Sequence, residues 1–468
     1  MKKHGEHRIP GFMDSHLHFL GIGMQADIIQ LNHITSVSEL ILDLKSRFHG
    51  HQMIGRGWNQ NRFDDRSMPT KNDLDQVSRD IPMVMYRVCG HVAVVNSAML
   101  ECINIESDSQ ISGGTIDRKT GIITEAALRL IDDQLQVVRI EDIKRYLIQA
   151  DRLLLQQGLT DVMSDDFIVS SLPYETIIQA IAELKAEKKL HVRITEQVHF
   201  RALSDFEDFI AKGYAHRNYG GFRLGPLKLL LDGSLGGRTA RLTHDYYDAP
   251  GQRGMLVYTD AMLKQYFDLA NLSGMDCHIH AIGDGAVDQF LRVMAASLED
   301  TKRKDHRHAI IHAQLATRAQ ISQMEALGVH AIVQPIFLES DIAMLDDRLG
   351  ATKNESYLFR TMAQSSIKVG MSTDAPVESF SPFHNLYAAM TRQSVRDHHM
   401  GPHLPEEAFS LEEALRCYQD DNRYLFRQEH EACDSEITLD RPLSDNPEQI
   451  RQTRVIEVQI KGTVVYHQ

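Results

Sequence analysis

Eight short apolar runs that read as β-strands recur along this 468-residue chain, and amphipathic helical stretches separate several of them. The runs lie near residues 9–18, 158–165, 190–198, 222–233, 275–283, 308–315, 329–337 and 367–376. Alternation of strands with helices is typical of βα units that build a parallel sheet. Eight such strands predict closure of the sheet, so we expect an α/β fold of the (β/α)8 TIM-barrel class.

Two intervals break the regular spacing. Residues 19–157 separate the first run from the second, which is far longer than an ordinary βα connection, so we expect an inserted subdomain or lid at about 50–150. From about residue 405 a helical stretch, an acidic linker and the alternating run RVIEVQIKGTVVY follow. We therefore predict a barrel domain over 9–404 that includes the insertion. Residues 405–468 are expected to form a helix and a small, incomplete β-sandwich subdomain.

The composition excludes several kinds of partner. With 50 Lys and Arg against 64 Asp and Glu, the net charge is −14, which argues against a nucleic-acid or anionic membrane surface and favours a small-molecule substrate. The five cysteines include no CxxC pair, which speaks against a disulfide scaffold or a thiolate zinc site and fits a reducing compartment. No apolar stretch approaches the length of a membrane span, and no signal-peptide core follows the N-terminal lysines. We expect a cytoplasmic protein.

Side chains that bind metals lie at the carboxyl ends of the predicted strands, where barrel enzymes carry their active sites. His16 and His18 are two residues apart, so on a strand both imidazoles point to one face and can reach one ion. Six residues would together build a two-metal hydrolytic centre: His16, His18, Lys228, His280, His312 and Asp374. Each has a plainer interpretation, because buried histidines are often core residues and an Asp before Pro is a common turn residue.

Lys228 is the most unusual member of this set. The run LKLLLDGS places Lys228 and Asp232 on one strand face and three leucines on the other, so the lysine points into the barrel. One interpretation is a buried ion pair with Asp232. The other is that a desolvated lysine near cations loses its proton and reacts with carbon dioxide, giving a carbamate that can bridge two metal ions.

Seven motifs occur in a fixed order over about residues 9–427: PGFMDSHLH, GRGWNQNRF, GHVAVVNSAML, LKLLLDGSLGGRTARL, HIHAIGDGAV, IIHAQL and GMSTDAPVES. In this order they resemble the amidohydrolase superfamily of metal-dependent barrel hydrolases. The specific likeness is to the amidohydrolase 3 branch, which includes YtcJ-like proteins and N-substituted formamide deformylases. The resemblance implies that the six residues above bind two divalent metal ions, Zn²⁺ or alternatively Fe, Mn, Co or Ni, with a carboxylated Lys228.

The resemblance also assigns roles outside the metal ligands. It implies that His91, on the insertion, reaches the site to bind or polarise the substrate, and that Trp58 and Arg238 belong to the pocket or lid. Read alone, His91 is a surface or core histidine, Arg238 pairs with a nearby carboxylate and Trp58 only packs. Only nine residues precede Pro10, so we expect half of the small sandwich that the resemblance implies to be missing. The sheet edge left exposed is one through which two copies could pair as a homodimer.

These residues predict a hydrolase that cleaves a carbon–nitrogen bond other than a peptide bond, such as an amide or N-formyl group. Metal-activated hydroxide would attack the carbonyl carbon, with Asp374 passing the proton to the leaving amine and His91 assisting. One alternative is a mononuclear deaminase-type amidohydrolase, which has no need for Lys228. The other is a non-catalytic metal-binding relative, which is disfavoured because every proposed ligand is present.

Overall fold

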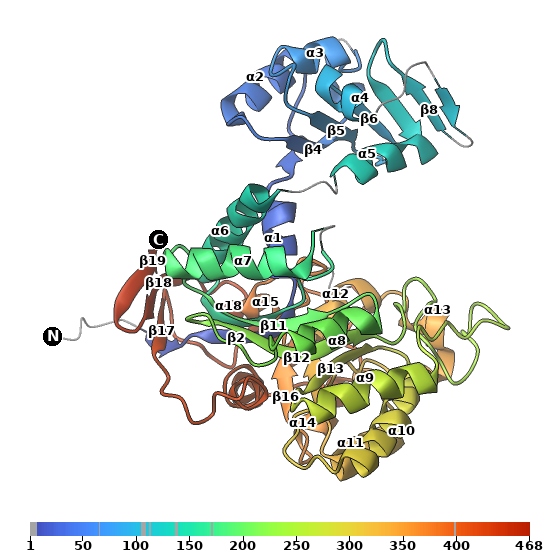
Figure 1. Ribbon diagram of the computed structural model, residues 1–468, viewed down its shortest axis with the longest axis vertical. Coiled ribbons are helices and arrows are strands. Elements are labelled where there is room, and N and C mark those ends of the chain that lie inside the picture. The colour runs from blue at the N-terminus through green and yellow to red at the C-terminus, as the bar shows by residue number, and fades with distance from the viewer. Residues whose placement is uncertain are drawn as a thin grey trace. The chain divides into compact units, whose positions relative to one another are not determined.

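The computed structural model divides the chain into two compact units (Figure 1). The first comprises Met1–Ile22, Leu147–Val169 and Pro173–Gln468, and the second Gly23–Tyr146 and Ser170–Leu172. The predicted subdomain over 405–468 groups with the barrel in this division. The structure describes residues 7–468 except 65, 104–108, 112–113, 136–138, 170–171 and 397–398.

Eight parallel strands form the main sheet of the first unit (Figure 1). They are β2 (Phe12–Leu17), β10 (Leu159–Ser164), β11 (Arg193–His199), β12 (Phe222–Leu230), β13 (Cys277–Ala281), β14 (Ala309–His312), β15 (His330–Val333) and β16 (Val369–Met371). Each strand pairs with the next one in this order. The two ends of the sheet also meet, since the amide of Asp374 donates to the carbonyl of His16 at 2.9 Å. The predicted (β/α)8 barrel is confirmed.

Helices connect successive strands of the barrel and supply its outer layer (Figure 1). They include α6 (Ile140–Gln156), α7 (Tyr174–Ala186), α8 (Leu203–Ala211), α9 (Asp260–Leu272), α10 (Asp284–Thr301), α11 (Arg318–Leu327), α12 (Leu338–Asp341), α13 (Leu345–Leu349), α14 (Phe359–Ala363) and α15 (Pro382–Thr391). Local sequence sets their ends: α11 begins in a capping box of Thr317 and Gln320 and stops at Gly328, which is left-handed. Within the described residues, no helix has the length and apolar character needed to span a bilayer.

A second, antiparallel sheet of the first unit joins both ends of the chain. Its order is β1 (His7–Pro10), β17 (Ser435–Leu439), β18 (Val455–Ile460) and β19 (Thr463–His467), and the short helices α16 (Leu411–Arg416), α17 (Asn422–Leu425) and α18 (Pro447–Ile450) precede or interrupt its C-terminal strands. The predicted β-structure outside the barrel is therefore present. It also includes β1: the sequence prediction counted Ile9 and Pro10 in the first barrel strand, whereas the structure pairs them with β17 and begins β2 at Phe12.

The second unit contains a seven-stranded sheet of its own, and its elements follow α1 (Phe19–Ala26). The strands are β3 (Ile29–Gln30), β4 (Met53–Trp58), β5 (Met83–Arg87), β6 (Val92–Val95), β7 (Ser109–Ile111), β8 (Gly114–Asp117) and β9 (Ile122–Glu125). The helices are α2 (Val37–Arg47), α3 (Lys71–Asp75), α4 (Ser97–Ile103) and α5 (Arg129–Leu135). This unit interrupts the chain between β2 and β10, within the interval for which an inserted subdomain was expected.

Candidate metal centre

Five of the six predicted ligands converge at the carboxyl ends of β2, β12, β14 and β16. The Nε2 atoms of His16 and His18 lie 3.3 Å and 3.1 Å from Oδ1 of Asp374, and Nε2 of His312 lies 3.9 Å from its Oδ2. One ligand atom each from His16, His312 and Asp374 lies within 4.8 Å of the others. Because imidazole nitrogens and carboxylate oxygens are common zinc ligands, this donor set fits a divalent metal ion.

Lys228 is the fifth member of this group and is fully buried. Its Nζ lies 3.0 Å from Nε2 of His16 and 4.0 Å from a carboxylate oxygen of Asp165. Burial lowers the pKa of Lys228, although the charges of Asp165 and Asp374 oppose the shift. The carboxylate beside the lysine is thus Asp165, and not the Asp232 that strand alternation indicated.

Asp232 instead tethers the loops that follow β12 and β13. Its carboxylate accepts the backbone N–H groups of Ile282, Gly283 and Arg241 at 2.8–3.0 Å. One of its oxygens also lies 3.3 Å from Nε2 of His280. The alternation rule failed here because β12 ends at Leu230, so Asp232 lies beyond the regular strand.

His280 lies at the edge of the cluster. Its ring centroid is 4.5 Å from that of His312 at a steep interplanar angle, so the two imidazoles are in contact. Its Nε2, however, lies 3.1 Å from the backbone carbonyl of Gly233. The structure therefore brings His280 beside the group through His312 and directs its Nε2 to the loop after β12.

The electrostatics of the group favour metal ligation. Burial, and next the positive charge of Lys228, lower the pKa of His16 to about 4, and burial holds the pKa of His312 well below its usual range. Burial opposes ionisation of Asp374, but the neighbouring imidazoles hold its pKa well below normal. Burial also opposes protonation of His18, yet its hydrogen bond to Asp374 and the charge of that carboxylate raise its pKa to about 9. His16, His312 and Asp374 are thus in the forms that bind cations, whereas His18 must release a proton to do so.

Sequence reasoning missed three residues that contact the candidate ligands. The Oε1 atoms of Gln197 and Gln334 lie 2.6 Å and 2.7 Å from Nδ1 of His16 and His312, and the backbone carbonyl of Asp165 lies 2.8 Å from Nδ1 of His18. Gln197 lies near the carboxyl end of β11, and Asp165 and Gln334 directly follow β10 and β15. The sequence signal that could have identified these residues is a polar side chain near the end of an otherwise apolar strand.

The three residues assigned to the pocket by resemblance have other contacts. His91 and Trp58 lie in the second unit: His91 is exposed, with Nδ1 3.0 Å from Glu125, and the buried Trp58 donates its indole N–H to the carbonyl of Met85 at 2.8 Å. Arg238 forms a two-pronged ion pair with Asp248 at 2.7 Å and 3.1 Å. Trp58 and Arg238 thus adopt the packing and pairing roles given above as alternatives, and substrate contacts of all three stay predictions.

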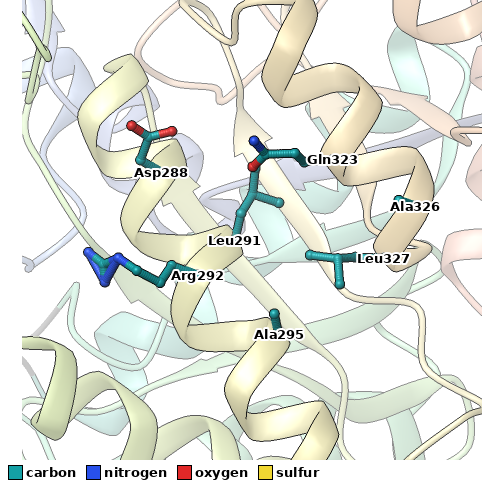
Figure 2. Close-up of a pocket in the computed structure, with 7 residues that line it drawn as sticks. All are labelled: Asp288, Leu291, Arg292, Ala295, Gln323, Ala326 and Leu327. Atoms are coloured by element: carbon teal, nitrogen blue, oxygen red, sulfur yellow. The ribbon is translucent and has the colours of Figure 1, made fainter.

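A groove on the outside of the barrel is separate from this centre. It has a volume of about 460 Å³ and runs between α10 and α11, as Figure 2 shows. Its lining residues are Asp288, Leu291, Arg292, Ala295, Gln323, Ala326 and Leu327. None of the predicted ligands is among them, so the groove is a feature of the helical layer.

Known proteins are similar to this chain in sequence and in fold. Residues 4–466 match the model described as the amidohydrolase family. The putative amidohydrolase YtcJ of Bacillus subtilis is 28% identical over 480 residues, covering 98% of this chain and 88% of the relative. The N-substituted formamide deformylase of Arthrobacter pascens is 22% identical over 496 residues, covering 99% and 89%. The crystal structure of an uncharacterized metal-dependent hydrolase from Pyrococcus furiosus has a TM-score of 0.75 at 29% identity, covering 95% and 88%. From its ordered motifs, its barrel and these matches, the chain belongs to the amidohydrolase family.

Proposed function

We propose that this protein is a metal-dependent hydrolase that cleaves a carbon–nitrogen bond other than a peptide bond in a small molecule. The observation that carries the proposal is the convergence of His16, His18 and His312 on the carboxylate of Asp374. An amide or N-formyl group is the proposed substrate class, supported by the family and by the relative named as a formamide deformylase. We propose Zn²⁺ as the metal, with Fe, Mn, Co or Ni as alternatives for the same donors.

A divalent metal held by His16, His18, His312 and Asp374 would supply Lewis-acid polarisation of the carbonyl and would lower the pKa of water towards about 7. The chain contributes the proton acceptor. Asp374 is held ionised by the imidazoles around it, so its carboxylate can take a proton from the attacking water. The protonated carboxyl then donates that proton to the departing nitrogen, which leaves as the amine while the carboxylic or formic acid forms.

We further propose that Lys228 is carboxylated and that two ions bind. Its amine is buried and its pKa is lowered, so more of it is neutral than in a solvent-exposed lysine. The neutral nitrogen attacks carbon dioxide, a C–N bond forms, one proton leaves, and the product is a carbamate anion. That anion would replace a buried ammonium by a bidentate carboxylate, a type of ligand that could serve two cations.

The second candidate is a mononuclear, deaminase-type centre. It is favoured by one observation: Nε2 of His280 contacts the carbonyl of Gly233 and does not point at the carboxylate of Asp374. A single ion would then need only ligands from the His16, His18, His312 and Asp374 group, and Lys228 would stay an amine.

Metal content and the state of Lys228 distinguish the two candidates. The protein is reconstituted with Zn²⁺ in ¹³C-labelled bicarbonate, metal per chain is measured, and a carbamate carbon is sought by NMR. Two ions and a carbamate signal that is lost in Lys228→Ala support the two-metal hydrolase. Lys185→Ala is the matched control, because Lys185 is also largely buried with a pKa lowered by burial to about 8. One ion without a carbamate favours the mononuclear centre, and no metal with no hydrolysis of N-formyl or N-acyl amines contradicts both.

A further inference from the structure

The three histidines beside Asp374 share a second feature, on the far side of each ring. Every Nδ1 lies 2.6–2.8 Å from a carbonyl oxygen, which belongs to an amide side chain for His16 and His312 and to the backbone for His18. A carbonyl oxygen can only accept a hydrogen bond. Each Nδ1 therefore carries a proton, and in the neutral His16 and His312 the nitrogen left for a metal ion is Nε2.

The orientation of the Gln197 amide is itself fixed by its other contacts. Its Nε2 lies 3.1 Å from the backbone carbonyl of Ser15 and 3.3 Å from Nδ1 of His278. Because Ser15 offers only an acceptor there, the NH2 group must lie on that side and Oε1 must lie towards His16. His278 is the last residue in this series of hydrogen bonds. Its Nε2 donates to the carbonyl of Arg307 at 3.2 Å, which leaves Nδ1 as an acceptor.

Gln334 is oriented by an independent set of partners. Its Nε2 lies 2.7 Å from the hydroxyl of Ser372 and 3.4 Å from the carbonyl of Ile332. That hydroxyl lies 3.3 Å from the carbonyl of Val333, to which it donates, so it accepts from the amide. The amide oxygen of Gln334 is thereby directed at His312, and both glutamines are fully buried.

We propose that Gln197 and Gln334 are positioning residues that fix the tautomer and ring orientation of His16 and His312 and thereby set the metal affinity of the centre. The inference rests on the proposed function, since it takes these histidines as ligands. Without an acceptor at Nδ1, a buried imidazole can place its proton on Nε2 or rotate, and either change removes the lone pair from the centre. Partners of this kind are typically worth 10–100-fold in metal affinity.

We choose Gln334 over Gln197 for the test, because two substitutions at this position change the acceptor for His312 in different ways. Gln334→Met fills a similar volume but offers no acceptor to His312, whereas Gln334→Glu keeps an acceptor oxygen and lets Ser372 turn its hydroxyl towards the carboxylate. Titration of metal-free protein with Co²⁺ gives the affinity, and the visible spectrum of bound Co²⁺ reports the geometry of its ligands. We expect affinity about 10–100-fold weaker for Gln334→Met with an altered spectrum, and rescue of both by Gln334→Glu.

Gln289→Met is the matched control. Gln289 is another buried glutamine and lies on α10. Its amide donates to the carbonyl of Tyr258 at 2.8 Å and to Asp260 at 3.0 Å. Gln289→Met removes similar hydrogen bonds, but these do not involve the proposed ligands. The Co²⁺ affinity of this variant should therefore match that of the wild type. The inference is overturned if Gln334→Met is folded, as judged by thermal unfolding, and binds Co²⁺ with the affinity and spectrum of the wild type.

A measurement on the wild-type protein keeps the inference testable if Gln334→Met does not fold. Imidazole ¹⁵N chemical shifts of the metal-free protein distinguish Nδ1–H from Nε2–H tautomers, and His312→Gln identifies the relevant signal. We expect His312 to be neutral with its proton on Nδ1, and an Nε2–H tautomer contradicts the inference. If wild-type protein binds no Co²⁺ while the tautomer is as expected, the proposed metal-dependent function fails and the hydrogen-bond assignment does not.

Discussion

Oδ1 of Asp374 lies 3.1 Å from Nε2 of His18, although 356 positions separate the two residues in the chain. His18 follows the first barrel strand and Asp374 follows the last, so the contact forms where the sheet closes. A backbone hydrogen bond from Asp374 to His16 and a second from His18 to Ala375 join the same two segments. The contacts that close the barrel therefore also bring the residues of the candidate metal centre together.

Asp374→Asn separates metal binding from proton transfer. The amide keeps one oxygen near the imidazoles but cannot accept the proton from water, so we expect turnover to fall by about 10²–10⁴-fold. Metal content per chain should stay largely unchanged, because three histidines remain in place. Asp151→Asn is the control, since Asp151 is buried and accepts hydrogen bonds from His191 and Val192 away from the site. Undiminished turnover in Asp374→Asn would remove this residue from the proton-transfer role.

The barrel was predictable because strands of a parallel sheet are buried on both faces and read as apolar runs. The histidines could be found because His16 and His18 lie two positions apart where the first barrel strand ends. The partner of Lys228 could not, because alternation stops where β12 ends and Asp165 comes from a different strand segment. Gln197 and Gln334 carry no such pattern: only their three-dimensional contacts distinguish them from other buried amides.

Trp58 provides a test of the insertion, because it is the only tryptophan of the chain. It packs with Met85, Leu31 and Val94 in a buried core of the second unit. Trp58→Ala should destabilise that unit by about 3–5 kcal/mol through the cavity and the lost indole contacts. Thermal unfolding followed by circular dichroism measures the effect, and Co²⁺ affinity of the first unit should not change. Unaltered stability combined with a higher KM would instead support the pocket role inferred by resemblance.

Asp276 anchors a buried ionic cluster that precedes β13. Its carboxylate accepts from Arg303 at 2.7 Å, from Arg427 at 2.8 Å and from the backbone N–H of Arg307 at 2.9 Å. Asp276→Asn removes the carboxylate that pairs with Arg303 and one of the two that pair with Arg427, which also contacts Asp305, so a loss of about 1–3 kcal/mol is expected.

The exposed pair between Asp245 and Arg253 is the comparison for this cluster. Because solvent screens that pair, Asp245→Asn should leave the thermal midpoint close to that of the wild type. Thermal midpoints of both variants give the contrast. Equal midpoints for Asp276→Asn and the wild type would show that the cluster does not contribute to stability.

Acid should destabilise the fold through buried neutral histidines, of which His330 is a clear case. Its Nδ1 accepts from the backbone N–H of Lys368 at 3.2 Å, and its ring packs edge-on against Tyr424. Burial first, and then the charges of His306 and His278, lower the pKa of His330 to about 4, whereas an unfolded histidine titrates near 6.5. Between these values the unfolded chain binds a proton that the folded chain does not.

The stabilising contribution of a neutral His330 is therefore complete above pH 6.5 and is lost as the pH falls towards 4. For this one group the loss approaches about 1.4 kcal/mol per pH unit. His330→Gln cannot bind that proton, so its stability should fall less steeply than that of the wild type between pH 7.5 and 5. Thermal midpoints in the presence of a chelator give both slopes, with exposed His216→Gln as the control. Parallel slopes for His330→Gln and the wild type would mean that His330 binds the same proton in the folded and unfolded states, which would contradict a neutral His330 that accepts the hydrogen bond from Lys368.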